Sequence, residues 1–220
     1  MKIELKKRII TSFFLLSLLS LMYFYTYILL IALIIIAVIS WFEFYGMISK
    51  IFKKKSYKDQ FFKILFKSLS LLYILVLVFI ILIIESKTPE FKIFIFYSVL
   101  VSVSSDIGGL IVGKTFKGKK LTKISPNKTI SGSIGSFILS LILVPIFINH
   151  LINHNFLTLS LITFFVSFTS QMGDLFISYL KRKAKIKDTS NLLPGHGGLL
   201  DRIDGIIFAV PIGLILLINF

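Results

Sequence analysis

The chain contains no cysteine and few carboxylates. Without thiols, disulfide bonds and thiol chemistry are excluded. Only ten of its 220 residues are Asp or Glu, against 25 Lys or Arg, which gives a formal net charge of +15. The sequence also lacks an internal repeat and any low-complexity segment typical of a disordered tail. What remains is a strongly basic chain in which each acidic residue can be considered individually.

Hydrophobic residues make up 56% of the chain, and its mean hydropathy is +0.92. That is too apolar for a soluble domain and indicates a polytopic membrane protein. We expect an all-α membrane bundle formed by one domain over residues 1–220, with N-terminal helices at 9–100 and a catalytic half at 101–220 that carries the polar motifs. In a membrane protein the positive charge is typical of cytoplasmic loops, so no nucleic-acid partner is expected.

Apolar stretches long enough to cross a bilayer predict about seven transmembrane helices. Residues 9–47 are too long for one helix, and we divide them near 23–27 into a tight helical hairpin. This first run has no small-residue cleavage site, so it is interpreted as an uncleaved span and not as a signal peptide. The other spans are expected near residues 69–85, 93–113, 130–149, 156–180 and 203–219.

The basic residues predict the orientation of these spans. They gather before the first span and within residues 50–67, 114–128 and 181–202. With seven spans, all of these segments lie on one side of the membrane, which the positive-inside rule identifies as the cytoplasm. We therefore expect the N-terminus inside and Phe220 outside.

Four carboxylates are expected to converge just beneath the cytoplasmic surface. Asp106 and Asp174 lie about 10–12 Å inside the cytoplasmic ends of their helices. Asp201 and Asp204 share one helix face where the last span begins. Intramembrane carboxylates are costly unless they are paired or bound to an ion, and clustered carboxylate oxygens suit a hard cation such as Mg²⁺. Asp106, Asp174, Asp201 and Asp204 are therefore candidate metal ligands, with structural Asp–Lys or Asp–Arg pairs as the alternative.

A fifth carboxylate, Glu43, lies inside the second expected span. The residues alone leave two interpretations open. Glu43 is either a functional group or a structural charge held by a partner.

The surrounding residues are typical of a phosphate site. Asp174, Ser178 and Lys181 or Arg182 share one helix face. The sequence "PGHGG" at 194–198 predicts a tight glycine-rich turn before a helix N-terminus, where backbone N–H groups can approach an anion. The segment "ISPNKTISG" at 124–132 repeats this scheme. Together with the carboxylates they indicate a nucleoside triphosphate with its metal, and His196 is either a phosphate contact, an acid or a structural residue.

The stretch from Ser178 to Asp204 resembles the motif of the phosphatidate cytidylyltransferase (CDP-diacylglycerol synthase) family. Upstream, "GDL" at 173–175, "SDIGGLIVGKTF" at 105–116 and "ISPNKT" at 124–129 also resemble family elements. The matched positions of the main motif are Ser178, Leu180, Lys181, Arg182, Lys187, Asp188, Ser190, Leu193, Pro194, His196, Gly197, Gly198, Asp201, Arg202 and Asp204.

The sequence departs from the family pattern at three places. Ile130 and Ser131 stand where the family usually has an aromatic residue followed by Glu or Gln. Ile177 replaces a usual carboxylate before Ser178, and the loop between Gly113 and Ser125 is one residue short.

The resemblance implies an integral membrane enzyme of the bacterial-type inner (plasma) membrane, a homodimer with its site facing the cytoplasm. It would convert CTP and phosphatidate to CDP-diacylglycerol and pyrophosphate with Mg²⁺, with or without a second cation. The implied catalytic residues are Asp174, Lys181, Arg182, Asp201, Arg202 and Asp204. The implied nucleotide contacts are Ser125, Lys128, Thr129, Ser178, Lys187, Asp188, His196, Gly197 and Gly198.

Two alternatives stay open from the sequence. The same chemistry could act on another lipid phosphate, such as an isoprenoid phosphate, because the sequence does not define the lipid tails. Buried Asp residues could instead mark a cation transporter. Transporters often carry inverted repeats and midplane sites, whereas no repeat is seen here and the carboxylates are expected near one surface.

Overall fold

The structure is a computed structural model that describes residues 2–53, 56–122, 125, 128–151 and 155–220. Over these residues the regular elements are helices, and β pairing is limited to two isolated bridges, Lys120 with Thr129 and Leu193 with Gly197. The expected all-α class is confirmed.

The chain forms two compact units, each built from two stretches of sequence. Unit 1 comprises Met1–Pro89 and Leu180–Ile203, and unit 2 comprises Glu90–Tyr179 and Asp204–Phe220. The motif segment that precedes Asp204 thus belongs to the same unit as the first helices, and the expected organisation of residues 1–220 as one domain stays a prediction.

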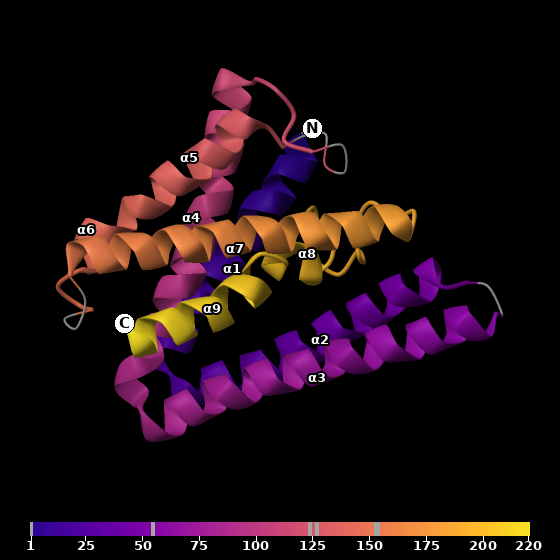
Figure 1. The fold of residues 1–220 in the computed structure, drawn as a ribbon, viewed down its shortest axis with the longest axis horizontal. Helices are drawn as coiled ribbons and strands as arrows, with labels where there is room; N and C mark the ends of the chain where they lie inside the picture. Colours follow the sequence, from indigo (N-terminus) through magenta and orange to yellow (C-terminus); the bar gives the residue numbers. More distant parts are fainter. Residues whose placement is uncertain (1, 54–55, 123–124, 126–127, 152–154) are drawn as a thin grey trace. The chain divides into compact units, whose positions relative to one another are not determined.

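Unit 1 contains α1 (Lys2–Phe24), α2 (Thr26–Ile51), α3 (Tyr57–Lys87) and α8 (Leu200–Ile203). Tyr25, which has extended backbone angles, separates α1 from α2, so the predicted break near residues 23–27 is confirmed. Helices α2 and α3 lie side by side (Figure 1). Near their connection the Phe52 ring stacks on Phe62 and Phe66.

Helix α3 begins at Tyr57, twelve residues before the expected span at 69–85. The expected start was wrong because Lys58, Lys63 and Lys67 interrupt the apolar run without interrupting the helix. The Lys67 ammonium lies 3.2 Å from the centre of the Tyr45 ring on α2, a cation–π contact that keeps this charge on the helix pair.

Unit 2 contains α4 (Lys92–Phe116), α5 (Ile130–Leu141), α6 (Leu143–Phe147) and α9 (Ile206–Asn219), together with α7 (Phe156–Lys183) as far as Tyr179. The short 3₁₀ helix η1 (Pro89–Phe91) precedes α4. Helix α5 ends at Leu141, the residue whose carbonyl the ring of Pro145 would meet in a continuous helix.

Glycines let α4 and α5 pack at backbone distance (Figure 1). A Cβ on Gly132 would lie 2.8 Å from the carbonyl oxygen of Gly109, and one on Gly108 would collide with the carbonyl of Gly135. Small residues at such crossings are typical of membrane helices, where close van der Waals packing replaces the hydrophobic effect.

Buried hydroxyls join α4 to α7. Ser102 Oγ lies 2.7 Å from Ser170 Oγ, and Tyr97 Oη lies 2.5 Å from Thr163 Oγ1. All four side chains are fully buried. These hydrogen bonds set the register of the two helices that carry Asp106 and Asp174.

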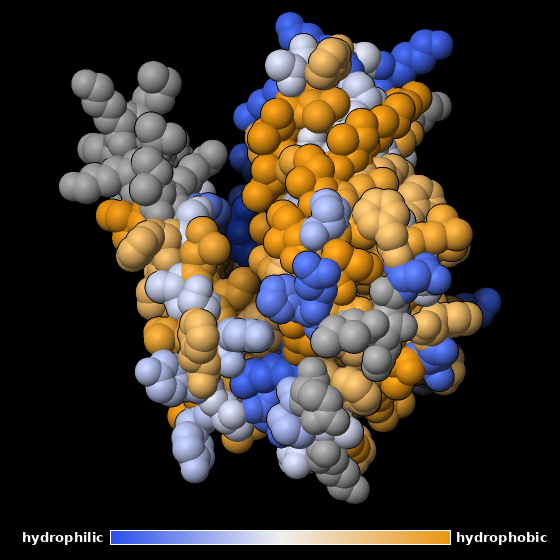
Figure 2. Space-filling model, turned by 90° about the vertical axis from the view of Figure 1, so that its left-hand side faces the viewer, coloured by the Kyte–Doolittle hydropathy of each residue, from blue (hydrophilic) through white to orange (hydrophobic). Residues whose placement is uncertain are grey.

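Five helices are long and apolar enough to cross a membrane within the described residues: Thr26–Ile51, Tyr57–Ser86, Lys92–Phe116, Ile130–Phe147 and Phe156–Lys183. Hydrophobic side chains make up much of the face shown in Figure 2. The first expected span is a shorter apolar helix, Ile10–Phe24, and the last is the 14-residue α9. The polytopic membrane class is confirmed, although the last helix is shorter than the predicted span at 203–219.

Candidate active site

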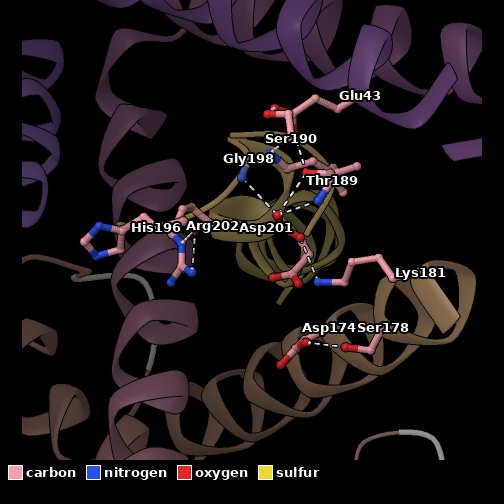
Figure 3. Close-up of polar contacts among 12 residues, drawn as sticks. Glu43, Asp174, Ser178, Lys181, Thr189, Ser190, His196, Gly198, Asp201 and Arg202 are labelled. Atoms are coloured by element: carbon pink, nitrogen blue, oxygen red, sulfur yellow. Dashed lines mark hydrogen bonds and ion pairs between the residues drawn. The ribbon is translucent and has the colours of Figure 1, made fainter. Parts of the chain in front are cut away.

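Asp174 on α7 is the centre of a polar group in unit 2. Lys128, from the segment that leads into α5, forms an ion pair with the Asp174 carboxylate. The Ser178 hydroxyl donates to Asp174 Oδ1 over 3.3 Å from one turn further along α7 (Figure 3). The Lys128 and Asp174 side chains are 27% and 23% exposed, so the pair is open to solvent or a ligand.

The backbone next to Asp174 meets the segment that carries Asp204. A Cβ on Gly173 would lie 2.8 Å from the carbonyl oxygen of Asp204 and 2.5 Å from the Phe208 ring. Asp204 is 6% exposed, and its Oδ1 accepts a hydrogen bond of 3.0 Å from the N–H of Gly205. Asp174 and Asp204 therefore lie on two backbone segments that touch because residue 173 has no side chain.

The segment before α5 meets the end of α4. Thr129 caps α5 by accepting from the N–H of Gly132 over 3.0 Å, and a Cβ on Gly113 would lie 3.1 Å from Thr129 Oγ1. The Lys128 N–H donates to the carbonyl of Ser125 over 3.1 Å. Three other residues of the expected "ISPNKT" element, Ile124, Pro126 and Asn127, lie outside the described residues.

The residues that depart from the family pattern have structural roles in unit 2. The Ser131 hydroxyl donates to the carbonyl of Lys117 and so ties the basic loop to α5. Ile177 is 3% exposed and contributes to the core.

Asp106 lies on α4 with an exposed side chain, next to the buried Ser105. Ser105 accepts from Ser167 on α7 through its hydroxyl and from Ser136 on α5 through its carbonyl. In the described part of the chain, no group of three or more His, Asp or Glu side chains is placed to hold a metal ion. The metal role of Asp106, Asp174, Asp201 and Asp204 stays a prediction.

In unit 1, Asp201 is held by donors from three positions (Figure 3). Lys181 Nζ lies 2.7 Å from Oδ1. The N–H of Thr189 donates to Oδ2 over 2.8 Å, and the N–H of Gly198 donates to the same oxygen over 3.0 Å. Burial by itself raises the pKa of Asp201, but Lys181 and the two N–H groups outweigh it and hold the pKa below its usual range. For Asp201 the structure supports the structural-pair alternative.

Glu43 on α2 is 8% exposed and points at the motif loop, which we define as residues 188–200 (Figure 3). Its two carboxylate oxygens accept four hydrogen bonds from this loop. The donors are Thr189 Oγ1 at 2.8 Å, Ser190 Oγ at 2.5 Å, Leu199 N at 3.0 Å and Leu200 N at 2.7 Å. Sequence reasoning left the role of Glu43 open, and its position inside an apolar helix was the only signal.

The motif loop contains the expected glycine-rich turn before a helix. The N–H of Leu193 donates to the carbonyl of Gly197, which has a φ of +83° that only glycine adopts without strain. Arg202 on α8 donates to the carbonyl of His196 through Nε at 3.0 Å and Nη2 at 2.8 Å. The turn also contacts α1, because the Thr11 hydroxyl donates to the carbonyl of Pro194.

Several expected phosphate contacts lie on this loop or beside it. Gly198 already donates its N–H to Asp201. The His196 ring lies 3.4 Å from the Ser12 hydroxyl through Nε2. The side chains of Arg182, Lys187 and Asp188 are exposed.

These features define a class: a polytopic membrane protein whose polar segments carry closely packed glycines and Asp carboxylates paired with Lys. The chain matches the Cytidylyltransferase family over residues 2–220 and belongs to that family.

Three relatives named phosphatidate cytidylyltransferase illustrate the similarity. The protein of Bacillus subtilis (strain 168) is 43% identical over 129 residues, which are 58% of this chain and 48% of that protein. The protein of Rickettsia prowazekii (strain Madrid E) is 41% identical over 135 residues, 57% of this chain and 58% of that protein. The protein of Rickettsia bellii (strain RML369-C) is 42% identical over 160 residues, 65% of this chain and 68% of that protein. The chain thus spans about half of the length of the first two relatives.

Proposed function

We propose that this protein is a phosphatidate cytidylyltransferase. It transfers the cytidylyl group of CTP to phosphatidate and produces CDP-diacylglycerol and pyrophosphate. Family membership and the names of the relatives support this activity over a cation transporter.

The observation that carries the proposal is the meeting of three motif segments in unit 2. Lys128 comes from the segment before α5, Asp174 from α7, and Asp204 from the segment before α9. Lys128 pairs with Asp174, and Gly173 packs on the Asp204 backbone. A cation and two carboxylates from distant parts of the sequence form the kind of group that binds a nucleotide phosphate through a metal ion.

The donor set of unit 2 fits Mg²⁺. This ion prefers hard oxygen ligands and is commonly held by one or two carboxylates together with substrate phosphates. Asp174 and Asp204 provide two such carboxylates on touching segments. When bound, Mg²⁺ would neutralise charge on the phosphates of CTP. We assign Asp174 and Asp204 as its main ligands, with Asp106 as a further candidate, and Asp201 as the partner of Lys181.

The reaction itself needs little acid–base chemistry. A phosphate oxygen of phosphatidate attacks the α-phosphorus of CTP in line, a new P–O bond forms, and the bond to the β-phosphate oxygen breaks to release pyrophosphate. The nucleophile is already an anion, so no strong general base is required. Catalysis then consists of positioning and of neutralising negative charge.

The cations of the motif segments perform that neutralisation in our proposal, and hydroxyls and the glycine-rich turn orient the phosphates. The proposed cationic contacts are Lys128, Lys181, Arg182, Lys187 and Arg202. The proposed polar contacts are Ser125, Thr129, Ser178, His196 and Gly197, with Asp188 orienting a neighbouring cation.

The proposed site faces the cytoplasm of a bacterial-type plasma membrane, and the enzyme acts as a homodimer. This orientation is supported by the positive-inside rule and by the substrates. CTP is soluble, whereas the acyl chains of phosphatidate stay in the bilayer throughout the reaction.

The proposal is tested with the purified protein in detergent, CTP, Mg²⁺ and labelled phosphatidate. We expect CTP-dependent formation of labelled CDP-diacylglycerol together with pyrophosphate. An isoprenoid phosphate is assayed in parallel. Conversion of that lipid but not of phosphatidate would overturn the substrate assignment, and conversion of neither would overturn the proposed activity.

A further inference from the structure

We propose that Glu43 is a positioning residue that holds the motif loop of residues 188–200 in its working conformation from inside the membrane-spanning helix α2. The consequence for catalysis rests on the proposed function. We call the hydrogen bonds between Glu43 and the motif loop the clamp. The clamp is a property of the folded chain, so its effect on the loop can be measured without CTP turnover.

One carboxylate fastens both ends of the loop. Near the start, the Thr189 and Ser190 hydroxyls donate to Glu43 over 2.8 and 2.5 Å. At the end, the N–H groups of Leu199 and Leu200 donate to it over 3.0 and 2.7 Å. The glycine-rich turn lies between these two anchor points. The ends of the turn therefore cannot separate while both sets of hydrogen bonds to Glu43 are formed.

The arrangement also defines what Glu43 does not do. A carboxylate offers about four lone-pair sites, and the four loop donors are placed at them, with the Thr189 hydroxyl shared with Asp201. Glu43 makes no ion pair with a described residue. Three donors of the loop bind this buried carboxylate alone and a fourth is shared with Asp201, so Glu43 serves the loop and not a metal ion or a substrate.

Thr189 connects this clamp to Asp201. Its hydroxyl lies 2.8 Å from Glu43 Oε2 and 3.0 Å from Asp201 Oδ2. A hydroxyl has one proton, so it can donate to only one of these carboxylates at a time. The N–H of the same residue donates to Asp201. A change at Glu43 therefore reaches the Lys181–Asp201 pair through Thr189, and also along the backbone from Leu199 and Leu200 to their neighbours Gly198 and Asp201.

The contact between Glu43 and the motif loop is closely packed at Gly198. A Cβ on Gly198 would lie 2.6 Å from Glu43 Oε2 and would collide with the Thr189 hydroxyl. Loops usually have more freedom than the elements they connect. Here Glu43 lies on the long helix α2, which packs against α3, and its carboxylate restricts the motion of the loop. A phosphate-binding loop needs such a restriction to hold its donors in a defined geometry.

The direct test is amide hydrogen exchange of the loop in Glu43→Gln. Gln keeps the shape of Glu but turns an N–H₂ group toward N–H and O–H donors. The reporter amides are those of Thr189, His196, Gly197 and Gly198, none of which donates to Glu43. We expect their exchange to become at least tenfold faster. Glu85→Gln is the matched control, since Glu85 accepts from the Thr26 hydroxyl far along α3, and should leave these amides unchanged.

Two further variants keep the test decisive if Glu43→Gln does not fold. Ser190→Ala removes one donor and should accelerate exchange of the same amides to a smaller extent. Glu43→Asp retains the charge and should restore part of the protection. Reporter amides that exchange at the wild-type rate in both Ser190→Ala and any folded Glu43 variant would overturn the clamp.

The kinetic readout separates the clamp from the proposed function. In Glu43→Gln we expect the KM for CTP to rise about five- to twentyfold, with a smaller change in kcat, because the loop carries proposed phosphate contacts. Glu43→Asp should recover part of that loss. Faster exchange in an enzyme whose wild type shows no CTP turnover would confirm the clamp and refute the proposed activity. Unchanged exchange refutes the clamp whatever the kinetics.

Discussion

Lys181 and Asp201 form a part-buried ion pair, with Nζ 2.7 Å from Oδ1 and side chains 13% and 4% exposed. The lysine is in the last turn of α7 and the aspartate is in α8. The two N–H groups that also bind Asp201 belong to the motif loop. The pair therefore fixes where the loop begins and ends, in addition to any contact it makes with substrate.

This pair predicts an asymmetric effect on stability. Lys181→Met leaves Asp201 buried without its cation, and we expect a loss of about 3–5 kcal/mol. The double variant Lys181→Met/Asp201→Asn should lose less, because the stranded charge is gone. Lys183→Met, at an exposed position of the same helix, is the control and should be near neutral. Thermal unfolding in detergent measures all three, and equal effects of Lys181→Met and Lys183→Met would contradict the prediction.

Glycine 173 offers a second prediction. In Gly173→Ala the new methyl group would lie 2.5 Å from the Phe208 ring and 2.8 Å from the Asp204 carbonyl. We expect a loss of about 1–3 kcal/mol from overpacking, with reduced CTP turnover because the segments of Asp174 and Asp204 are pushed apart. Gly46→Ala is the matched control, since a Cβ at Gly46 meets nothing within 4 Å. It should be neutral or slightly stabilising, because Ala favours the helix by about 1 kcal/mol.

The absence of cysteine makes the topology directly testable. Single cysteines at Asn149 and at Lys117 should differ in their reaction with a membrane-impermeant maleimide applied to intact cells. We expect labelling at Asn149, on the external side, and labelling at Lys117 only after permeabilisation. Protection of Asn149 together with exposure of Lys117 would reverse the orientation and place the proposed site on the wrong side for CTP.

The sequence predicted those features that depend on local composition. The all-α class follows from hydropathy, the break at Tyr25 from the length of the first apolar run, and the turn at 194–198 from its glycines. Helix α3 shows where composition fails. Its charged N-terminal turns continue the helix because aromatic residues between the lysines pack against Phe52.

The contacts of the candidate site could not be obtained in this way. Glu43 binds residues about 150 positions further along the chain, and no local pattern encodes such a pairing. The charge of Asp201 was predicted to be balanced either by a bound cation or by neighbouring Lys or Arg, and the sequence could not name Lys181, Thr189 and Gly198 as its donors. The position of a carboxylate along its helix predicts how far it lies from the membrane surface. It does not predict the partner of the carboxylate, because the partner depends on how the helices pack.

Asp204→Asn tests the metal hypothesis. Asn keeps the shape and the oxygen that accepts from Gly205 N–H, but loses the charge that would hold Mg²⁺. We expect nucleotidyl transfer to be abolished, the unfolding temperature to stay within a few degrees of wild type, and Asp174→Asn to behave alike. Chelator should silence the wild type and added Mg²⁺ should restore it, whereas Asp59→Asn on α3 should leave turnover unchanged. If Asp204 instead holds a buried cation of the protein, its Asn variant would lose about 3–5 kcal/mol, and the chelator would have no effect. An unstable variant beside a chelator-insensitive wild type would refute metal-dependent cytidylyl transfer at Asp204.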